Sequence, residues 1–333
     1  MAIRRWLILL LFVSATSLLP ISARIFAADE PDLAATAASL LATMRANHFH
    51  PAELETEAYK KIEDSVRNLG STAASPEEFL NGFNTLWRGG PFSHVRLYYR
   101  PPTVGSTPPD DPARPGNGIV SLAWQNKVAI LTVNSMSNSS ELIEAAYHEI
   151  VGQGAATLII DLRRNGGGAF GVMPLIGHLI DEARDIGVFV TNRWYEDHQT
   201  PPSAEALKTA TPCTCTDAAF ATDMETRALT SYRIEPLLPR FSGPVYVLTS
   251  RVSISAAEIA AEALQASGRA TIVGEKTPGV LLQPKLFTVG NGFSLMWPIG
   301  DYRTVTNGRI EGVGVTPDIT ASADTALEVA LSR

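Results

Sequence analysis

Ser255 follows a strand pattern and begins an alanine-rich segment, where a serine can act as a helix cap or as a nucleophile. The apolar run Val245–Leu248 predicts a buried strand, and residues 256–266, which lack Pro and Gly, predict a helix. As an N-cap, the hydroxyl would accept a free backbone N–H, and Glu258 completes a capping box. As a nucleophile, its oxyanion would be stabilised by the same N–H groups and the positive helix end. This stretch alone favours the cap.

A histidine beside a serine is the second candidate for chemistry. Gly89, Gly90 and Pro91 break a helix, and the alternation after them predicts a strand. His94 therefore lies at a loop-to-strand junction, next to Ser93. A lone histidine in such a place is more often structural. It gains a catalytic interpretation only if another segment supplies its partners.

A run of three glycines, Gly166–Gly168, follows the apolar run 156–162, which predicts a strand buried on both faces. Such a turn can present free backbone N–H groups to an anion. A dinucleotide site is the obvious rival, but there is no G-x-G-x-x-G and no Walker lysine follows. A plain tight turn is disfavoured because three consecutive glycines carry a heavy entropic cost.

The elements that must position these residues form an α/β pattern. A signal peptide at 1–28 is followed by a helical N-terminal unit at 29–100, a proline-rich linker at 101–117 and an α/β domain at 118–333. Helices are expected within 33–69, at 76–87 with Ser75 as N-cap, at 140–153, from about 170, and at 324–331. Strands are expected at 118–123, 127–133, 270–273, 285–289, 292–298 and 302–305. A polar insertion at about 197–243 is expected to be irregular, with a helical piece at 222–229, and could form a lid.

Composition and the first residues indicate where the protein acts. Arg4 and Arg5 precede the apolar run Trp6–Val13, which is typical of a secretory signal, and cleavage after Ala28 is expected. A retained anchor is the alternative, although the run is short for a membrane span. We therefore expect an exported protein, periplasmic or extracellular, without stable membrane insertion after signal cleavage.

The charges and ligand-type residues exclude several kinds of partner. A net charge of −7 without a Lys/Arg cluster argues against nucleic acid or an anionic membrane surface. The two cysteines, Cys213 and Cys215, are either reduced or joined in a small bridge, and no zinc pattern lies beside them. His48 and His50 indicate a surface turn, because no third metal ligand is near. No metal or organic cofactor is expected, and the sequence does not indicate an oligomeric state.

Four segments, in this order along the chain, resemble the tail-specific (C-terminal processing) serine protease superfamily. They are FSHVRL, LIIDLRRNGGG, SISAAEI followed by GRATIVGEKTPG, and EGVGVTPD. The resemblance covers most of the chain from about Gly90 to Asp318 and implies a crotonase-like core of ββα type. Processing proteases of this superfamily commonly carry a PDZ domain, whose place here holds only the proline-rich segment.

The resemblance also implies roles for particular residues. Ser255 matches the nucleophile. One branch of the superfamily uses a lysine as general base, but the matching position here holds Val280, and Lys276 lies four residues before it. The tricorn-core and interphotoreceptor retinoid-binding-protein-like branch instead uses a histidine, which matches His94. Its supporting residues match Ser93 and Glu311. The backbone N–H of Gly166 or Gly167, together with that of Ala256, would form the oxyanion hole.

These residue types suit acyl transfer, because serine is a weak nucleophile that needs an adjacent base, and the base needs an orienting partner. The leading hypothesis is an exported serine peptidase that hydrolyses peptide bonds through an acyl-enzyme. A hydrolase of non-peptide esters or amides is one alternative, and a non-catalytic module that binds an apolar ligand is another. An ordinary α/β-hydrolase is disfavoured because no G-x-S-x-G occurs.

Overall fold

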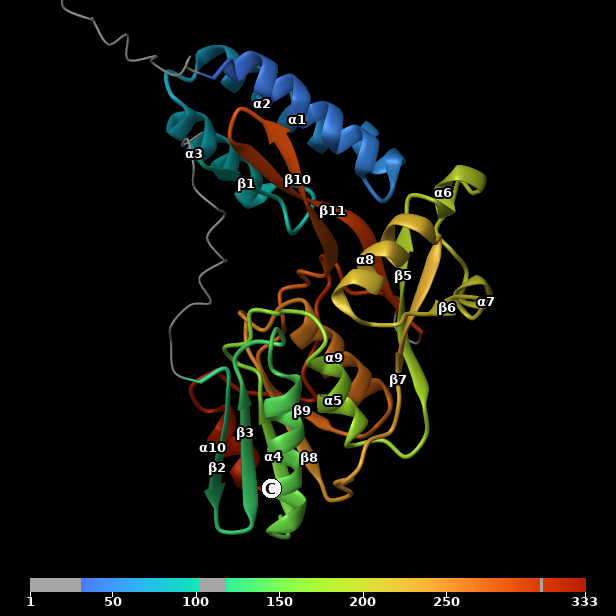
Figure 1. The fold of residues 1–333 in the computed structure, drawn as a ribbon. Helices are drawn as coiled ribbons and strands as arrows, with labels where there is room; N and C mark the ends of the chain where they lie inside the picture. The colour runs from blue at the N-terminus through green and yellow to red at the C-terminus, as the bar shows by residue number, and fades with distance from the viewer. Residues whose placement is uncertain (1–30, 102–117, 306–307) are drawn as a thin grey trace, which may run out of the picture. The chain divides into compact units, whose positions relative to one another are not determined.

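A computed structural model describes residues 31–101, 118–305 and 308–333, and those from Asp32 onward belong to one compact unit (Figure 1). The predicted signal peptide and nearly all of the predicted linker lie outside the described residues. None of the described helices combines the length and apolar character that crossing a bilayer requires.

Three N-terminal helices begin at side-chain caps, of which the sequence predicted the one at Ser75. They are α1 (Leu33–Asn47), α2 (Glu57–Thr72) and α3 (Pro76–Leu86), with short 3₁₀ turns at Pro51–Glu55 and Trp87–Gly89. The Ser75 hydroxyl accepts the Glu78 N–H at 3.1 Å, while the Glu78 carboxylate accepts the Ala74 N–H at 2.8 Å. The reciprocal bond of this capping box therefore reaches one residue further back than expected.

The N-terminal helices share their core with strands from the far end of the chain. Leu40, Phe79 and Phe83 pack in one buried cluster with Phe293 and Trp297. Strand β1 (Arg96–Tyr99) also pairs with β11 (Phe293–Thr304), so that Arg96 lies opposite Met296. This packing fixes the segment carrying His94 against the rest of the fold (Figure 1).

A six-stranded sheet carries the second candidate segment. Its order is β13–β9–β8–β4–β3–β2, and all neighbours are parallel except the β2–β3 hairpin. The strands are β2 (Val120–Gln125), β3 (Val128–Val133), β4 (Thr157–Asp161), β8 (Val245–Thr249), β9 (Thr271–Gly274) and β13 (Ile319–Thr320). The helices are α4 (Ser140–Gly152), α5 (Val172–Gly177), α9 (Ala256–Ala266) and α10 (Ala326–Leu331). Helix α9 has the predicted bounds.

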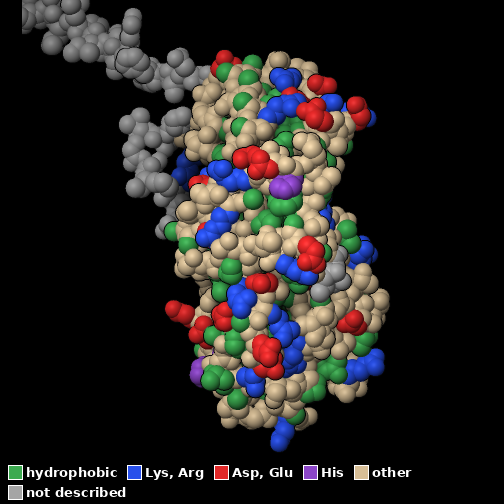
Figure 2. Space-filling model, turned by 90° about the vertical axis from the view of Figure 1, so that its right-hand side faces the viewer, with side chains coloured by type: hydrophobic (Ala, Val, Ile, Leu, Met, Phe, Trp, Pro, Cys, Tyr) green, Lys and Arg blue, Asp and Glu red, His purple; other side chains and the backbone are tan. Residues whose placement is uncertain are grey.

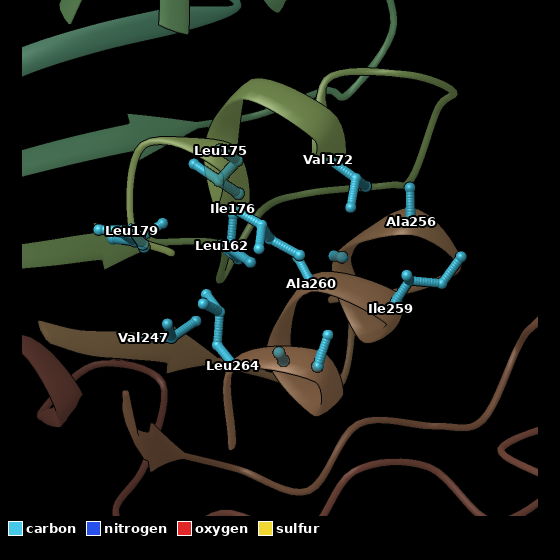
Figure 3. Close-up of a cluster of buried hydrophobic side chains, with 14 of the residues drawn as sticks. Leu162, Val172, Leu175, Ile176, Leu179, Val247, Ala256, Ile259, Ala260 and Leu264 are labelled. Atoms are coloured by element: carbon cyan, nitrogen blue, oxygen red, sulfur yellow. The ribbon is translucent and has the colours of Figure 1, made fainter. Parts of the chain in front are cut away.

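Helices cover both faces of this sheet. Because side chains alternate along a strand, Leu158 and Ile160 of β4 join the main buried cluster with α4, α5 and α9. Ile159, between them, points to the other face and packs near Ala326 and Ala330 of α10. In Figure 3, Val172, Leu175 and Ile176 of α5 meet Ala256, Ile259 and Ala260 of α9. This contact holds the start of α9 in place.

A second, seven-stranded sheet joins the N-terminal unit to the insertion. Its path is β1–β11–β5–β7–β6, with β10 and β12 also paired to β11. The strands are β5 (Arg184–Thr191), β6 (Thr211–Pro212), β7 (Leu229–Ile234), β10 (Leu282–Gly290) and β12 (Gly308–Arg309). Short helix α6 (Trp194–Asp197) precedes the insertion, and α7 (Ala204–Leu207) and α8 (Asp217–Thr226) lie within it.

The predicted helix at 222–229 is thus wrong at its end, because Leu229 begins a buried strand. The predicted strands at 292–298 and 302–305 are a single strand, β11, which continues through Pro298. The surface turn expected at NHFHP is also wrong for His48. Its side chain is 1% exposed and packs against Phe49 and Phe92, with ring centroids 4.4 and 4.3 Å away.

Acidic and basic side chains are interspersed over the face shown in Figure 2. Among the described residues, exposed charges also form pairs, as in Lys208 with Glu205 at 2.8 Å. A surface of mixed sign creates only a weak extended field, because neighbouring charges cancel.

Candidate active site

Ser255 stands at the N-terminus of α9 in an unusual backbone conformation. Its φ of 56° and ψ of −118° lie outside the regions that L-residues ordinarily occupy. Such a conformation costs about 1–3 kcal/mol and persists only where the surroundings enforce it. Here the Ser255 N–H donates to both the Val280 carbonyl and the Glu258 carboxylate at 3.0 Å.

Glu258 holds this corner together from inside the protein. Its side chain is fully buried and accepts four hydrogen bonds. The donors are the N–H groups of Ser255, Gly279 and Val280, at 3.0, 2.7 and 2.9 Å, and the Thr277 hydroxyl, at 2.6 Å. Burial raises the pKa of Glu258, whereas these donors oppose that rise. Of the expected capping box, the bond from the Ser255 N–H to the Glu258 carboxylate is thus present. The bonds from Gly279 and Val280 also hold the loop after β9 in place.

His94 belongs to a chain of hydrogen bonds with Ser93 and Glu311. The Ser93 Oγ lies 2.9 Å from His94 Nδ1 and 2.9 Å from Glu311 Oε2. Glu311 also accepts the N–H groups of Ser93 at 3.0 Å and Leu281 at 2.7 Å. Three donors around one carboxyl group favour its ionised form, which can only accept.

This arrangement assigns the histidine tautomer. Since the Ser93 hydroxyl must donate its single proton to Glu311, its lone pair is left to accept from His94 Nδ1–H. The other ring nitrogen, Nε2, then carries a lone pair and is the basic atom. His94 itself has a φ of 57°, a further position of backbone strain in this corner.

Burial shifts the pKa values of both titrating members of this chain. Burial raises the pKa of Glu311, against the opposing hydrogen bonds from Leu281 and Ser93. Burial lowers the pKa of His94 to about 4, because its charged form loses contact with water. From the sequence alone, His94 was expected to have the ordinary histidine pKa of 6.5. The structure therefore extends the neutral, basic form of His94 to lower pH.

The glycine-rich turn lies directly against the serine. A Cβ added to Gly167 would come 2.8 Å from Ser255 Cβ and 3.4 Å from its Oγ. The Gly167 N–H is taken by Asn165 Oδ1 at 2.8 Å. Within the described residues, the N–H groups of Gly166 and Ala256 have no hydrogen-bond partner. Between the two glycines proposed from the sequence, the geometry therefore favours Gly166 as the donor beside Ala256.

A cavity of about 690 Å³ brings the separate segments together. Ser255, His94, Gly166 and Ala256 all line it. Ser93 and Glu311 are outside this lining and support His94 from behind. Among the described residues, no group of His, Cys, Asp and Glu forms a metal-binding cluster.

Three supporting residues were not recognised from the sequence. The Asn165 side chain accepts a hydrogen bond from the Gly167 N–H and donates one to the Val133 carbonyl at 2.9 Å. Its backbone carbonyl accepts the Ile254 N–H at 3.1 Å. Thr277 bonds Glu258, and Glu258 was noted only as a cap. For Asn165, the only signal in the sequence is that it directly precedes the three glycines.

The fold and this cavity define an α/β protein with a serine and a tautomer-fixed histidine, the residue types of a serine hydrolase. The model of peptidase family S41 matches residues 127–321, so the chain belongs to this family of serine-type peptidases. The expected resemblance to C-terminal processing proteases is confirmed.

Curated relatives match part of the chain. It is 25% identical over 192 residues to the chloroplastic C-terminal processing peptidase of Tetradesmus obliquus, covering 58% of this chain and 34% of that protein. It is 28% identical over 207 residues to the carboxyl-terminal-processing protease of Synechocystis, covering 59% and 40%. The chain thus spans between a third and two fifths of the length of these relatives.

Solved structures share the fold. A putative peptidase from Parabacteroides merdae superposes with a TM-score of 0.63 at 15% identity, covering 91% of this chain and 96% of that one. The photosystem II D1 C-terminal processing protease gives 0.54 at 14% identity, covering 89% and 94%. A lipoprotein from Streptococcus agalactiae gives 0.56 at 16% identity, covering 96% and 98%. The expected mixed α/β fold with N-terminal helices is confirmed.

Proposed function

We propose that this protein is an exported serine peptidase that cleaves peptide bonds through an acyl-enzyme on Ser255, with His94 as general base. The observation that carries the proposal is the Glu311–Ser93–His94 chain, which leaves the Nε2 lone pair of a cavity-lining histidine free. Ser255 lines the same cavity at a helix N-terminus, where unpaired N–H groups can receive an oxyanion.

The reaction follows from these atoms. His94 Nε2 accepts the Ser255 proton as Oγ attacks the substrate carbonyl carbon, and the N–H groups of Gly166 and Ala256 stabilise the oxygen that becomes negative. The tetrahedral intermediate collapses, the C–N bond breaks, and His94 returns the proton to the leaving amine. Water then attacks the acyl ester with His94 again as base, which releases the acid and restores Ser255.

Two other functions remain candidates. A hydrolase of non-peptide esters or amides would use the same atoms in the same steps. A non-catalytic module that binds an apolar ligand is favoured by the apolar cavity lining, but such a module has no use for a histidine held in one tautomer. The hydrogen-bonded chain therefore supports catalysis over binding alone.

Several finer statements belong to this proposal. The branch is the tricorn-core and retinoid-binding-protein-like one, because Val280, and not a lysine, follows the T-x-G segment. The expected lack of a PDZ domain rests on the proline-rich segment that stands in its place. A crotonase-like core is supported by the order β2, β3, α4, which is a ββα unit. Export to the periplasm or the extracellular space, and the division at 29–100 and 118–333, rest on the sequence patterns of the first residues and of the proline-rich segment.

The proposal is tested by hydrolysis of an unstructured protein and of simple acyl esters by the mature wild type, Ser255→Ala and His94→Ala. We expect the wild type to cleave the protein, and both substitutions to abolish cleavage while circular dichroism stays native. Ester cleavage alone would support the non-peptide hydrolase. Absence of both activities, with saturable binding of an apolar ligand, would support the binding module.

A further inference from the structure

The cavity beside Ser255 is walled by aromatic side chains that the catalytic steps do not use. They come from the segment after the glycine turn, from β5, β7 and β11, and from α8 of the insertion. They are Phe170, Phe189, Phe220, Tyr232 and Tyr302, and Met224 of α8 lines the cavity beside them. A cavity of about 690 Å³ with this lining can hold the largest amino-acid side chains.

The aromatic rings are arranged edge to face. Phe220 meets Phe170 with centroids 5.7 Å apart at 85°, and meets Phe189 at 5.0 Å and 74°. Phe189 in turn meets Tyr302 at 5.1 Å and 63°. Phe189 and Tyr302 are almost fully buried, at 6% and 0% exposure, whereas Phe220 is only partly buried. Phe220 thus presents ring surface that a further aromatic ring can contact.

The charges at this cavity do not favour a charged substrate side chain. Apart from His94, the charged residues in the described lining are Lys285 and Glu225, and they form an ion pair with each other. Each neutralises its partner, so a charged side chain that enters would lose water without gaining an unpaired counter-ion.

We propose that this protein selects peptide bonds flanked by a bulky aromatic side chain, and that Phe220 determines this selection. The inference rests on the proposed peptidase function and adds its substrate class. It also gives the insertion a role, because α8 supplies one wall of the specificity cavity. Met224, on the same helix and 4% exposed, anchors α8 in the main core. A change at Phe220 therefore alters the cavity without removing the helix.

The test is cut-site mapping by mass spectrometry on a peptide library whose members differ next to the cleaved bond. It compares the wild type, Phe220→Ala and Leu238→Ala. Leu238 is a matched control, since it is an apolar residue of the same insertion, is 83% exposed and lies outside the cavity lining. The readout is the ratio of kcat/KM for an aromatic residue to that for alanine at the selected position.

We expect a wild-type ratio of at least about tenfold, a fall of about tenfold in Phe220→Ala, and an unchanged ratio in Leu238→Ala. Cleavage without aromatic enrichment, or an unchanged ratio in Phe220→Ala, would overturn the inference and leave the peptidase proposal intact. If the library is not cut, the peptidase proposal fails, and the same ratio measured on p-nitrophenyl esters of N-acetylphenylalanine and N-acetylalanine decides the role of the cavity. Failure to cleave those esters as well would overturn both.

Discussion

Replacement of Gly167 by alanine should displace the nucleophile without unfolding the protein. Gly167 has a φ of 91°, and its added Cβ would lie 2.8 Å from Ser255 Cβ, closer than two carbons can approach. The positive φ costs an alanine about 1–2 kcal/mol. Crowding in a packed site adds about 1–3 kcal/mol. We therefore expect the free energy of unfolding to fall by about 2–5 kcal/mol. This loss is smaller than the total of about 5–15 kcal/mol that is typical of a folded domain.

The matched control is Gly268→Ala, since Gly268 also has a positive φ, of 66°, but has no neighbour within 4 Å of an added Cβ. This control should lose only about 1–2 kcal/mol and keep its activity. A shift of Ser255 by about 1 Å should lower kcat/KM of Gly167→Ala about 100-fold. Urea unfolding and peptide hydrolysis measure the two effects. Equal stability and wild-type activity in Gly167→Ala would refute the packing argument.

The hydrogen-bonded chain, and the disulfide that joins Cys213 to Cys215 in the structure, give further measurable outcomes. Because burial lowers the pKa of His94 to about 4, kcat/KM should stay level as pH falls through 6.5 and decline only near pH 4. A decline centred on the ordinary histidine value would contradict this. Glu311→Gln should lower kcat about 10²–10⁴-fold with little change in KM, because the amide can donate to Ser93 and reverse the tautomer. A wild-type kcat would argue against the chain. Reduction of the Cys213–Cys215 disulfide should lower the free energy of unfolding by only about 1–2 kcal/mol, because the residues are two positions apart and the closed loop is short. Urea unfolding with and without reductant tests this, and a loss above about 4 kcal/mol would show that the bond does more than close a loop.

Local patterns predicted the elements around the nucleophile well. The apolar run before Ser255 and the alanine-rich run after it are self-contained signals, and α9 occupies the expected residues. Strand β11 was divided wrongly, because Pro298 and Gly300 are local breakers. In the structure β11 is long and pairs with β1 near its start, with β10 from Phe293 to Asp301, and with β5 near its end. Pairing with distant strands overrides local propensity, and a single sequence does not reveal it.

The same limit applies to the site. Ser255, His94, Ser93 and Glu311 were proposed from residue types and a family resemblance. In the structure Ser255 and His94 line one cavity, and Ser93 and Glu311 are hydrogen-bonded behind His94. The sequence could not show whether Gly166 or Gly167 is the oxyanion-hole donor, because only the fold shows that the Gly167 N–H is hydrogen-bonded to Asn165. The burial that lowers the pKa of His94 also arises from packing that sequence spacing does not encode.

The central claim is that Ser255 is an activated nucleophile, and it is tested most directly by labelling with a fluorophosphonate probe followed by peptide mapping. Ser75→Ala is the matched control, since Ser75 is also the N-cap of a helix with a glutamate three residues on but lies outside the cavity lining. We expect one adduct, on Ser255, in the wild type and in Ser75→Ala, and none in Ser255→Ala or His94→Ala. An adduct on another residue, or labelling that persists in Ser255→Ala, would contradict the account.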